Sequence, residues 1–185
     1  MKTIGKFAIF SAVGFGICGA ILGAGYEFKG ALVVLFGLPV VGAIGGVALG
    51  LALGRGWRKT AALAGVGAIG FFLGSLVGFI YTAMFTGLSF WEAQLEELEE
   101  ILDSIIFHSV LGTVLGTALG LALWNRRKVI GLGLAGALGG AIGAMIMSAV
   151  SLSLWHQMAL QGIVGGAFLG AALGYLETRK VDGEE

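Results

Sequence analysis

Hydrophobic residues fill six long stretches of this chain, and short polar or charged clusters separate them. The stretches cover about residues 7–26, 30–54, 60–85, 105–124, 129–150 and 157–176. Each has about 20 residues or more, the length that an α-helix needs to cross a hydrocarbon layer of roughly 30 Å. The pattern therefore predicts an all-α integral membrane protein with six transmembrane helices.

Glycine recurs at every fourth position in the second, fourth and sixth stretches. These glycine ladders are Gly42, Gly46, Gly50 and Gly54, then Gly112, Gly116 and Gly120, and finally Gly162, Gly166, Gly170 and Gly174. A spacing of four places the glycines on one helical face, where the missing side chains let another backbone come close. We therefore predict that each ladder is a helix-packing surface.

A denser glycine pattern precedes each ladder. It reads Gly14, Gly16, Gly19 and Gly23, then Gly65, Gly67, Gly70 and Gly74, then Gly131, Gly133, Gly136 and Gly140. In each set the last two glycines are also predicted to pack against a helix, namely Gly19, Gly23, Gly70, Gly74, Gly136 and Gly140. Two patterns that alternate in one order indicate three tandem, duplicated helix hairpins, with chance similarity as the alternative.

The hairpins divide the chain into three repeats and a tail. The first repeat covers residues 1–59, the second 60–128 and the third 129–180, and 181–185 form a short acidic tail. A basic leader followed by an apolar run is also typical of a cleaved signal peptide. We expect the first stretch to be retained, because it carries the same glycine pattern as two later helices.

Basic residues cluster where the ladder helices end. With six spans, one side of the membrane receives Lys2, Lys6, Arg55, Arg58, Lys59, Arg126, Arg127, Lys128, Arg179 and Lys180. Only Lys29 falls on the other side. Because the positive side of a membrane protein faces the cytoplasm, we predict that both termini are cytoplasmic and that the protein lies in a prokaryotic cytoplasmic membrane.

One insertion, residues 89–104, enlarges the middle repeat. Hydrophobic residues recur there at helical spacing, and Ser89 with Glu92 forms a capping-box pattern. We predict an amphipathic helix on the outer membrane surface. It is either a solvated cap or a docking face for a basic partner or a cation, whose candidate residues are Trp91, Glu92, Glu96, Glu99, Glu100 and Asp103.

Composition supports the membrane interpretation. The chain is 57% hydrophobic and 12% charged and contains 35 glycines, whereas soluble domains are about 25% charged. Glycine costs about 1 kcal/mol relative to alanine in a water-exposed helix, but in lipid it serves close packing. A formal net charge of zero gives no reason to expect nucleic acid, and the single cysteine, Cys18, excludes an internal disulfide.

Catalytic motifs are missing from the sequence. Three GxGxxG matches lie inside apolar helical stretches rather than after strands, which favours packing over dinucleotide binding. No acidic or basic residue lies in the middle of a span, and this argues against a proton-driven pump. We therefore expect a protein that is not an enzyme and needs no cofactor.

Two histidines are the remaining candidates for chemistry. His108 precedes the second ladder and His156 opens the sixth stretch. Neutral imidazoles are common axial ligands, so the pair could hold haem or a chlorin. The alternative is that both are interfacial histidines hydrogen-bonded to their neighbours.

Paired glycine-rich helices such as these resemble the ring-forming proteolipid subunits of rotary ATPases. The resemblance implies a close-packed hairpin, carried by the repeats at Gly14–Gly23 and Gly65–Gly74. The proton-binding carboxylate of that family has no counterpart here, so the resemblance covers packing style alone.

These observations leave two classes of function. The first is a non-enzymatic structural or assembly subunit of a homo-oligomer or larger membrane complex, because six glycine faces exceed what one small bundle needs. The alternative is a channel or facilitator for small uncharged solutes or ions. In either case the lipid bilayer is the surrounding partner.

Overall fold

The computed structural model describes residues 2–29, 31–54, 56–86, 96–150 and 152–178, and these form six helices. The helices are α1 (Lys2–Lys29), α2 (Ala31–Ala52), α3 (Trp57–Thr86), α4 (Glu96–Ala122), α5 (Arg126–Ala149) and α6 (Leu154–Thr178). No strand occurs in the described part of the chain. The predicted all-α class is confirmed.

Five helices contain segments long and apolar enough to cross a membrane. These segments are Thr3–Ala24, Trp57–Val77, Ile101–Ala122, Arg126–Ala149 and Leu154–Thr178. α2 contains a shorter apolar segment, Gly37–Ala52. The five segments support a multi-pass membrane protein, and a sixth crossing by α2 stays a prediction.

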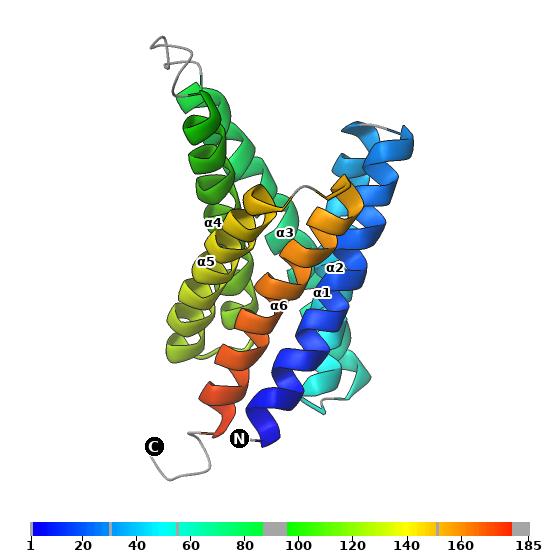
Figure 1. The fold of residues 1–185 in the computed structure, drawn as a ribbon. Helices are drawn as coiled ribbons and strands as arrows, with labels where there is room; N and C mark the ends of the chain where they lie inside the picture. The colour runs from blue at the N-terminus through cyan, green and yellow to red at the C-terminus, as the bar shows by residue number, and fades with distance from the viewer. Residues whose placement is uncertain (1, 30, 55, 87–95, 151, 179–185) are drawn as a thin grey trace.

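The six helices form a ring. Each helix packs against its neighbours in sequence, and α6 returns to pack against α1. Both termini lie at the same end of the ring (Figure 1). At the opposite end α3 and α4 diverge from α1 and α2, so the ring is splayed there (Figure 1).

The closest backbone approaches join each ladder helix to the helix that follows it around the ring. A Cβ on the ladder glycines nearest the middle of each interface would lie at about 2 Å from a backbone carbonyl oxygen of the neighbouring helix. Representative contacts are Gly46 on Leu63 of α3 (2.2 Å), Gly112 on Gly136 of α5 (2.0 Å) and Gly162 on Phe15 of α1 (2.1 Å). The close pairs are therefore α2–α3, α4–α5 and α6–α1.

These close pairs join successive predicted repeats rather than the two helices within one predicted repeat. The closest contacts inside the first two predicted repeats are with side chains, and the nearest backbone atom is the Leu111 carbonyl oxygen, 3.0 Å from a Cβ on Gly74. A Cβ on Gly14 would meet the Ala48 methyl at 2.5 Å, and one on Gly70 would meet the Ala118 methyl at 2.8 Å. The closest backbone contacts thus link the three predicted repeats into one ring.

Gly54 differs from the other glycines predicted to pack. It lies beyond the end of α2 with φ of +62°, and a Cβ there would meet nothing within 4 Å. Positive φ just past a helix end is the usual conformation of a C-terminal glycine. Gly54 therefore ends α2 and does not contact a neighbouring helix.

Buried apolar side chains fill the ring near the end that carries the termini. The cluster includes Phe7, Leu49, Leu63, Leu119, Leu132 and Leu173, one from each helix. Phe15, Leu115 and Leu169 continue the cluster toward the middle of the ring. This cluster therefore closes the interior of the ring toward the end that carries the termini.

The first turns of α4 correct the predicted boundary of the amphipathic insertion. α4 begins at Glu96 and continues without a break to Ala122, so residues 96–104 are not a separate helix. Residues 96–111 contain neither glycine nor proline, and Glu, Leu and Ile sustain a helix across the predicted boundary. Trp91 and Glu92 lie outside the described residues.

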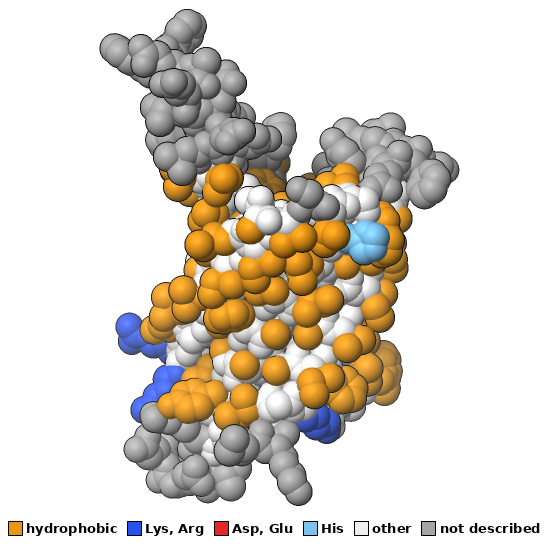
Figure 2. Space-filling view, viewed as in Figure 1, with side chains coloured by type: hydrophobic (Ala, Val, Ile, Leu, Met, Phe, Trp, Pro, Cys, Tyr) orange, Lys and Arg blue, Asp and Glu red, His pale blue; other side chains and the backbone are white. Residues whose placement is uncertain are grey.

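Hydrophobic side chains cover the outside of the ring. Figure 2 shows them over the helical surface, with lysine and arginine side chains gathered at the end that carries the termini. Exposed examples are Ile9, Ile17, Ile69, Leu134 and Leu138. An apolar belt with basic residues at one end is typical of a protein surrounded by lipid.

Candidate functional site

A cavity of about 750 Å³ lies inside the ring. All six helices contribute to its lining. Phe15, Leu115 and Leu169 belong both to the lining and to the buried cluster, so they form the floor of the cavity. The cavity therefore lies between the packed end of the ring and the splayed end.

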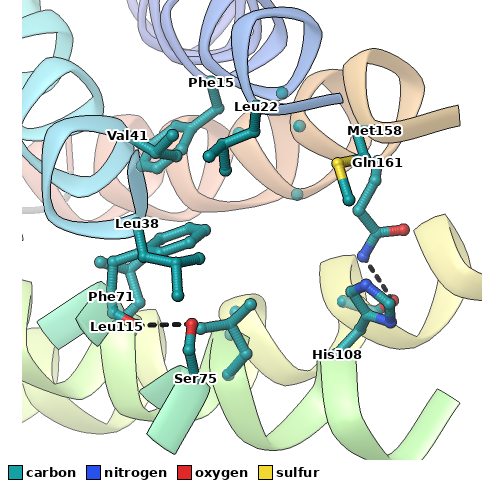
Figure 3. Close-up of a pocket in the computed structure, with 18 of the residues that line it drawn as sticks. Phe15, Leu22, Leu38, Val41, Phe71, Ser75, His108, Leu115, Met158 and Gln161 are labelled. Carbon is teal, nitrogen blue, oxygen red and sulfur yellow. Dashed lines mark hydrogen bonds between the residues drawn. The ribbon is translucent and has the colours of Figure 1, made fainter. Parts of the chain in front are cut away.

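The helix pairs explain why the cavity forms. Backbone contacts at the glycine ladders hold α2–α3, α4–α5 and α6–α1 close together. Large side chains such as Phe71 and Met158 reach into the space between the pairs (Figure 3). Because α3 and α4 diverge from α1 and α2 toward the splayed end (Figure 1), these side chains do not fill the space between the helices.

Three polar side chains stand among the apolar residues that the structure describes in the lining. They are Ser75 on α3, His108 on α4 and Gln161 on α6 (Figure 3). The described lining contains no carboxylate, lysine or arginine. The cavity is therefore apolar and uncharged, with a few hydrogen-bonding groups.

Ser75 uses its hydrogen inside its own helix. The buried Ser75 Oγ donates a hydrogen bond to the Phe71 carbonyl oxygen at 2.8 Å. A serine hydroxyl has one hydrogen and two lone pairs. Toward the cavity Ser75 can therefore act only as an acceptor.

His108 is oriented by the turn that precedes it. Its Nδ1 lies 2.7 Å from the Ser104 carbonyl oxygen. A carbonyl oxygen only accepts, so Nδ1 carries the hydrogen and donates it, and Nε2 of the neutral ring is an acceptor. The Phe107 ring meets the imidazole edge-on at 5.1 Å between centroids.

Gln161 connects α6 to α5. Its Nε2 donates to the Gly140 carbonyl oxygen at 3.1 Å. Its Oε1 is buried and has no hydrogen-bond partner among the described residues. The amide packs on Gly143, where a Cβ would lie 2.5 Å from Oε1. An unpaired buried amide oxygen costs about 1–3 kcal/mol.

The two histidines predicted as a ligand pair do not meet. His108 lines the cavity. His156 is exposed at the start of α6, where its ring stacks on Trp155 at 3.4 Å between centroids and its Nδ1 lies 2.6 Å from Ser153 Oγ. The described residues contain no cluster of three metal-ligating side chains. The arrangement gives the haem or chlorin pair no geometric support.

The acidic residues of the predicted docking face lie in the first turns of α4. Glu96, Glu99 and Glu100 open this helix, and Asp103 follows as a half-buried residue. Their neighbours Trp91 and Glu92 fall outside the described residues. The docking face therefore stays a prediction.

Sequence reasoning did not single out Ser75 or Gln161. Serine is common as a helix-to-helix contact in membranes, so Ser75 gave little signal. Gln161 gave more, because it stands directly before the ladder glycine Gly162 inside an apolar stretch. An uncharged amide at that depth needs a hydrogen-bond partner, and this requirement could have identified Gln161 as a candidate site residue.

A buried ion pair lies at the opposite, packed end. The Lys128 ammonium donates to Glu177 Oε1 and joins the start of α5 to the end of α6. Lys128 is only 2% exposed. Asn125 caps α5, and its side chain accepts from the Arg127 and Lys128 backbone N–H groups at 2.9 and 3.2 Å.

A second hollow of about 500 Å³ adjoins this ion pair. Its lining consists of Thr3, Lys6, Phe7, Ala52, Leu53, Glu177 and Thr178.

Comparison of the chain with protein-family models, with curated proteins and with solved structures found no match.

Proposed function

We propose that this chain is a non-enzymatic membrane protein that takes a small, uncharged and largely apolar molecule into the ring and facilitates its movement across the bilayer. The observation that supports the proposal is the cavity of about 750 Å³, which all six helices line. Binding pockets for small molecules usually measure about 300–1,000 Å³ and are mostly apolar, with a few polar groups.

The lining favours an uncharged occupant. Among the described lining residues there is no charged side chain to pair with an ion. Moving a bare charge from water into such surroundings is expensive without a partner. An ion pathway is therefore the weaker form of the facilitator hypothesis.

The buried cluster closes the cavity on the side of the termini. We propose that six spans place the basic end and both termini in the cytoplasm, so that the cavity opens outward. Leu49, Leu119 and Leu173 are almost completely buried below the cavity floor. Movement to the cytoplasm would require these leucines to separate.

The glycine ladders would act as zippers in this scheme. Backbone contacts make α2–α3, α4–α5 and α6–α1 the closest pairs of the ring. Three stiff pairs joined by looser side-chain contacts could tilt against one another, as packed helices do in shear motions. The proposed motion opens one end while the other closes.

A structural or assembly subunit stays the second hypothesis. Its support was the number of glycine faces. In the structure the ladder glycines other than Gly54 contact helices of the same chain. Intramolecular contacts of this kind leave less glycine surface for a partner, so the facilitator hypothesis has the stronger argument.

Blocking the cavity tests the proposal. Gly165 lines the cavity, and a Cβ there would meet nothing within 4 Å, so Gly165→Phe adds a ring to the cavity without a backbone clash. We expect purified protein in vesicles to accelerate the transbilayer movement of a radiolabelled monoacylglycerol, measured by extraction with albumin. Gly165→Phe should return the rate to that of protein-free vesicles.

Gly65→Phe is the matched control. Gly65 is exposed on the outside of the ring, and a Cβ there also meets nothing within 4 Å. This variant should move the lipid as fast as the unmodified protein. Equal rates with and without protein, or a fully active Gly165→Phe, would contradict the facilitator proposal.

A further inference from the structure

We infer that the cavity recognises a neutral amphiphile whose polar end is a hydrogen-bond donor, such as a hydroxyl group, on an apolar chain. The inference rests on the proposed function and specifies its ligand class. The donor would bind between His108 and Gln161, and the chain would extend toward Phe15, Leu115 and Leu169.

Three donors on the cavity lining are already used. Ser75 Oγ donates to the Phe71 carbonyl, His108 Nδ1 to the Ser104 carbonyl, and one hydrogen of Gln161 Nε2 to the Gly140 carbonyl. The groups left over are three acceptors, namely a serine lone pair, His108 Nε2 and Gln161 Oε1, and one donor, the second hydrogen of Gln161 Nε2. Acceptors outnumber donors, so the lining favours a ligand that brings a hydrogen.

Two of these acceptors belong to neighbouring side chains. Figure 3 shows Gln161 from α6 beside His108 from α4, with the amide nitrogen of Gln161 directed toward His108 and its oxygen directed away. Both contact the same turn of α5: Gln161 bonds to the Gly140 carbonyl, and a Cβ on Gly140 would lie 2.1 Å from the His108 carbonyl oxygen. The described residues provide no partner for Gln161 Oε1.

The unpaired Gln161 oxygen indicates a ligand with a hydrogen-bond donor rather than a hydrocarbon. A hydrocarbon would leave this acceptor without a partner, and buried polar groups in proteins are usually paired. A hydroxyl ligand could reach it after a small rotation of the amide. The oxygen of the ligand hydroxyl needs no donor from the protein, because it can accept a hydrogen bond from water at the splayed end.

The depth of the site fits a chain with a polar end. Leu115 lies seven residues after His108 on α4, and Leu169 lies eight residues after Gln161 on α6. At 1.5 Å per residue the floor is roughly 10 Å from the polar pair. Apolar side chains line this path, including Phe71 and Leu111.

The test compares two ligands that differ only in the donor. A diazirine-bearing long-chain alcohol is photo-cross-linked to the protein in nanodiscs, and unlabelled dodecanol or methyl dodecyl ether competes. Losing one hydrogen bond to a buried acceptor changes affinity by about tenfold. We therefore expect dodecanol to compete at about a tenth of the ether concentration.

Variants assign that preference to the two acceptors. Gln161→Met and His108→Phe should each reduce the preference for the alcohol several-fold while ether competition is kept, which also shows that the cavity is intact. Gln157→Met and His156→Phe are matched controls at exposed or half-buried positions away from the lining. Both controls should keep the full preference.

The outcomes separate the two proposals. Equal competition by alcohol and ether would overturn the donor inference and leave an apolar binding cavity in place. Failure of both to compete, with cross-links confined to the outer surface at residues such as Ile9 and Leu134, would overturn the proposed function as well. Retention of the preference in both cavity variants would also reject the inference.

Discussion

Gly112→Ala is expected to lower the free energy of unfolding by about 3 kcal/mol, the upper part of the usual range for overpacked sites. The new methyl carbon would lie 2.0 Å from the Gly136 carbonyl oxygen and 2.6 Å from its carbon. Both are backbone atoms, so no side-chain rotation can make room. α4 and α5 would have to separate and lose dispersion contacts along the whole interface.

Unfolding of the purified protein by increasing mole fractions of sodium dodecyl sulfate, followed by circular dichroism, measures this loss. Gly65→Ala is the control, because its Cβ would meet nothing within 4 Å and alanine favours a helix. It should be neutral or slightly stabilising. A Gly112→Ala variant as stable as the control would show that α4 and α5 are not in close backbone contact.

Glu177→Gln is expected to destabilise the protein by about 3 kcal/mol. Lys128 is 2% exposed, and Glu177 carries the carboxylate that neutralises it. Removing one partner of a buried ion pair leaves an uncompensated charge, which typically costs about 3–5 kcal/mol. The 23% exposure of the Glu177 side chain places the expected loss at the lower end.

The double variant Lys128→Met with Glu177→Leu distinguishes a buried charge from lost packing. Replacing both partners by apolar residues often restores stability, so most of the loss should be recovered in the same unfolding assay. A Glu177→Gln variant with unchanged stability would mean that water reaches Lys128. In that case the end of α6 does not cover the start of α5.

The helices could be predicted because lipid imposes a length and an apolar composition on each one. The errors lie at the ends. The pattern predicts that the third and fifth helices begin after the basic clusters, at about residues 60 and 129, yet α3 begins at Trp57 and includes Arg58 and Lys59, and α5 begins at Arg126 behind the Asn125 cap. Charged residues at a membrane surface stay hydrated, so nothing prevents the backbone from continuing as a helix.

The ladders predicted close packing but not the partner helix. Spacing of four defines a face, whereas the choice between the preceding and the following helix depends on how the helices rotate. In the structure Gly42 meets Gly67 of α3, and Gly166 meets Ser11 of α1, far away in sequence. Closure of the ring through α6 and α1 could not be read from local periodicity.

The cavity was beyond sequence reasoning for the same reason. It exists because α3 and α4 diverge from α1 and α2 toward one end, and this depends on the tilt of the helices. Sequence identified His108 as a candidate and paired it with His156, but residue type alone could not show that His156 points outward while Gln161 lies beside His108. The missing information was helix register.

Cross-linking α1 to α6 tests most directly whether one chain closes the ring. Thr3 and Thr178 line the same hollow at the terminal end. In a Cys18→Ala background, the Thr3→Cys, Thr178→Cys variant should form an intramolecular link with a short bismaleimide, identified by peptide mapping of the monomer band. Thr3→Cys with Trp124→Cys is the control, because Trp124 is 95% exposed beyond the end of α4.

The account predicts a monomer linked in high yield for the first variant and little linkage for the control. Links found only between two chains, or equal yields in both variants, would contradict a ring closed by α6 and α1.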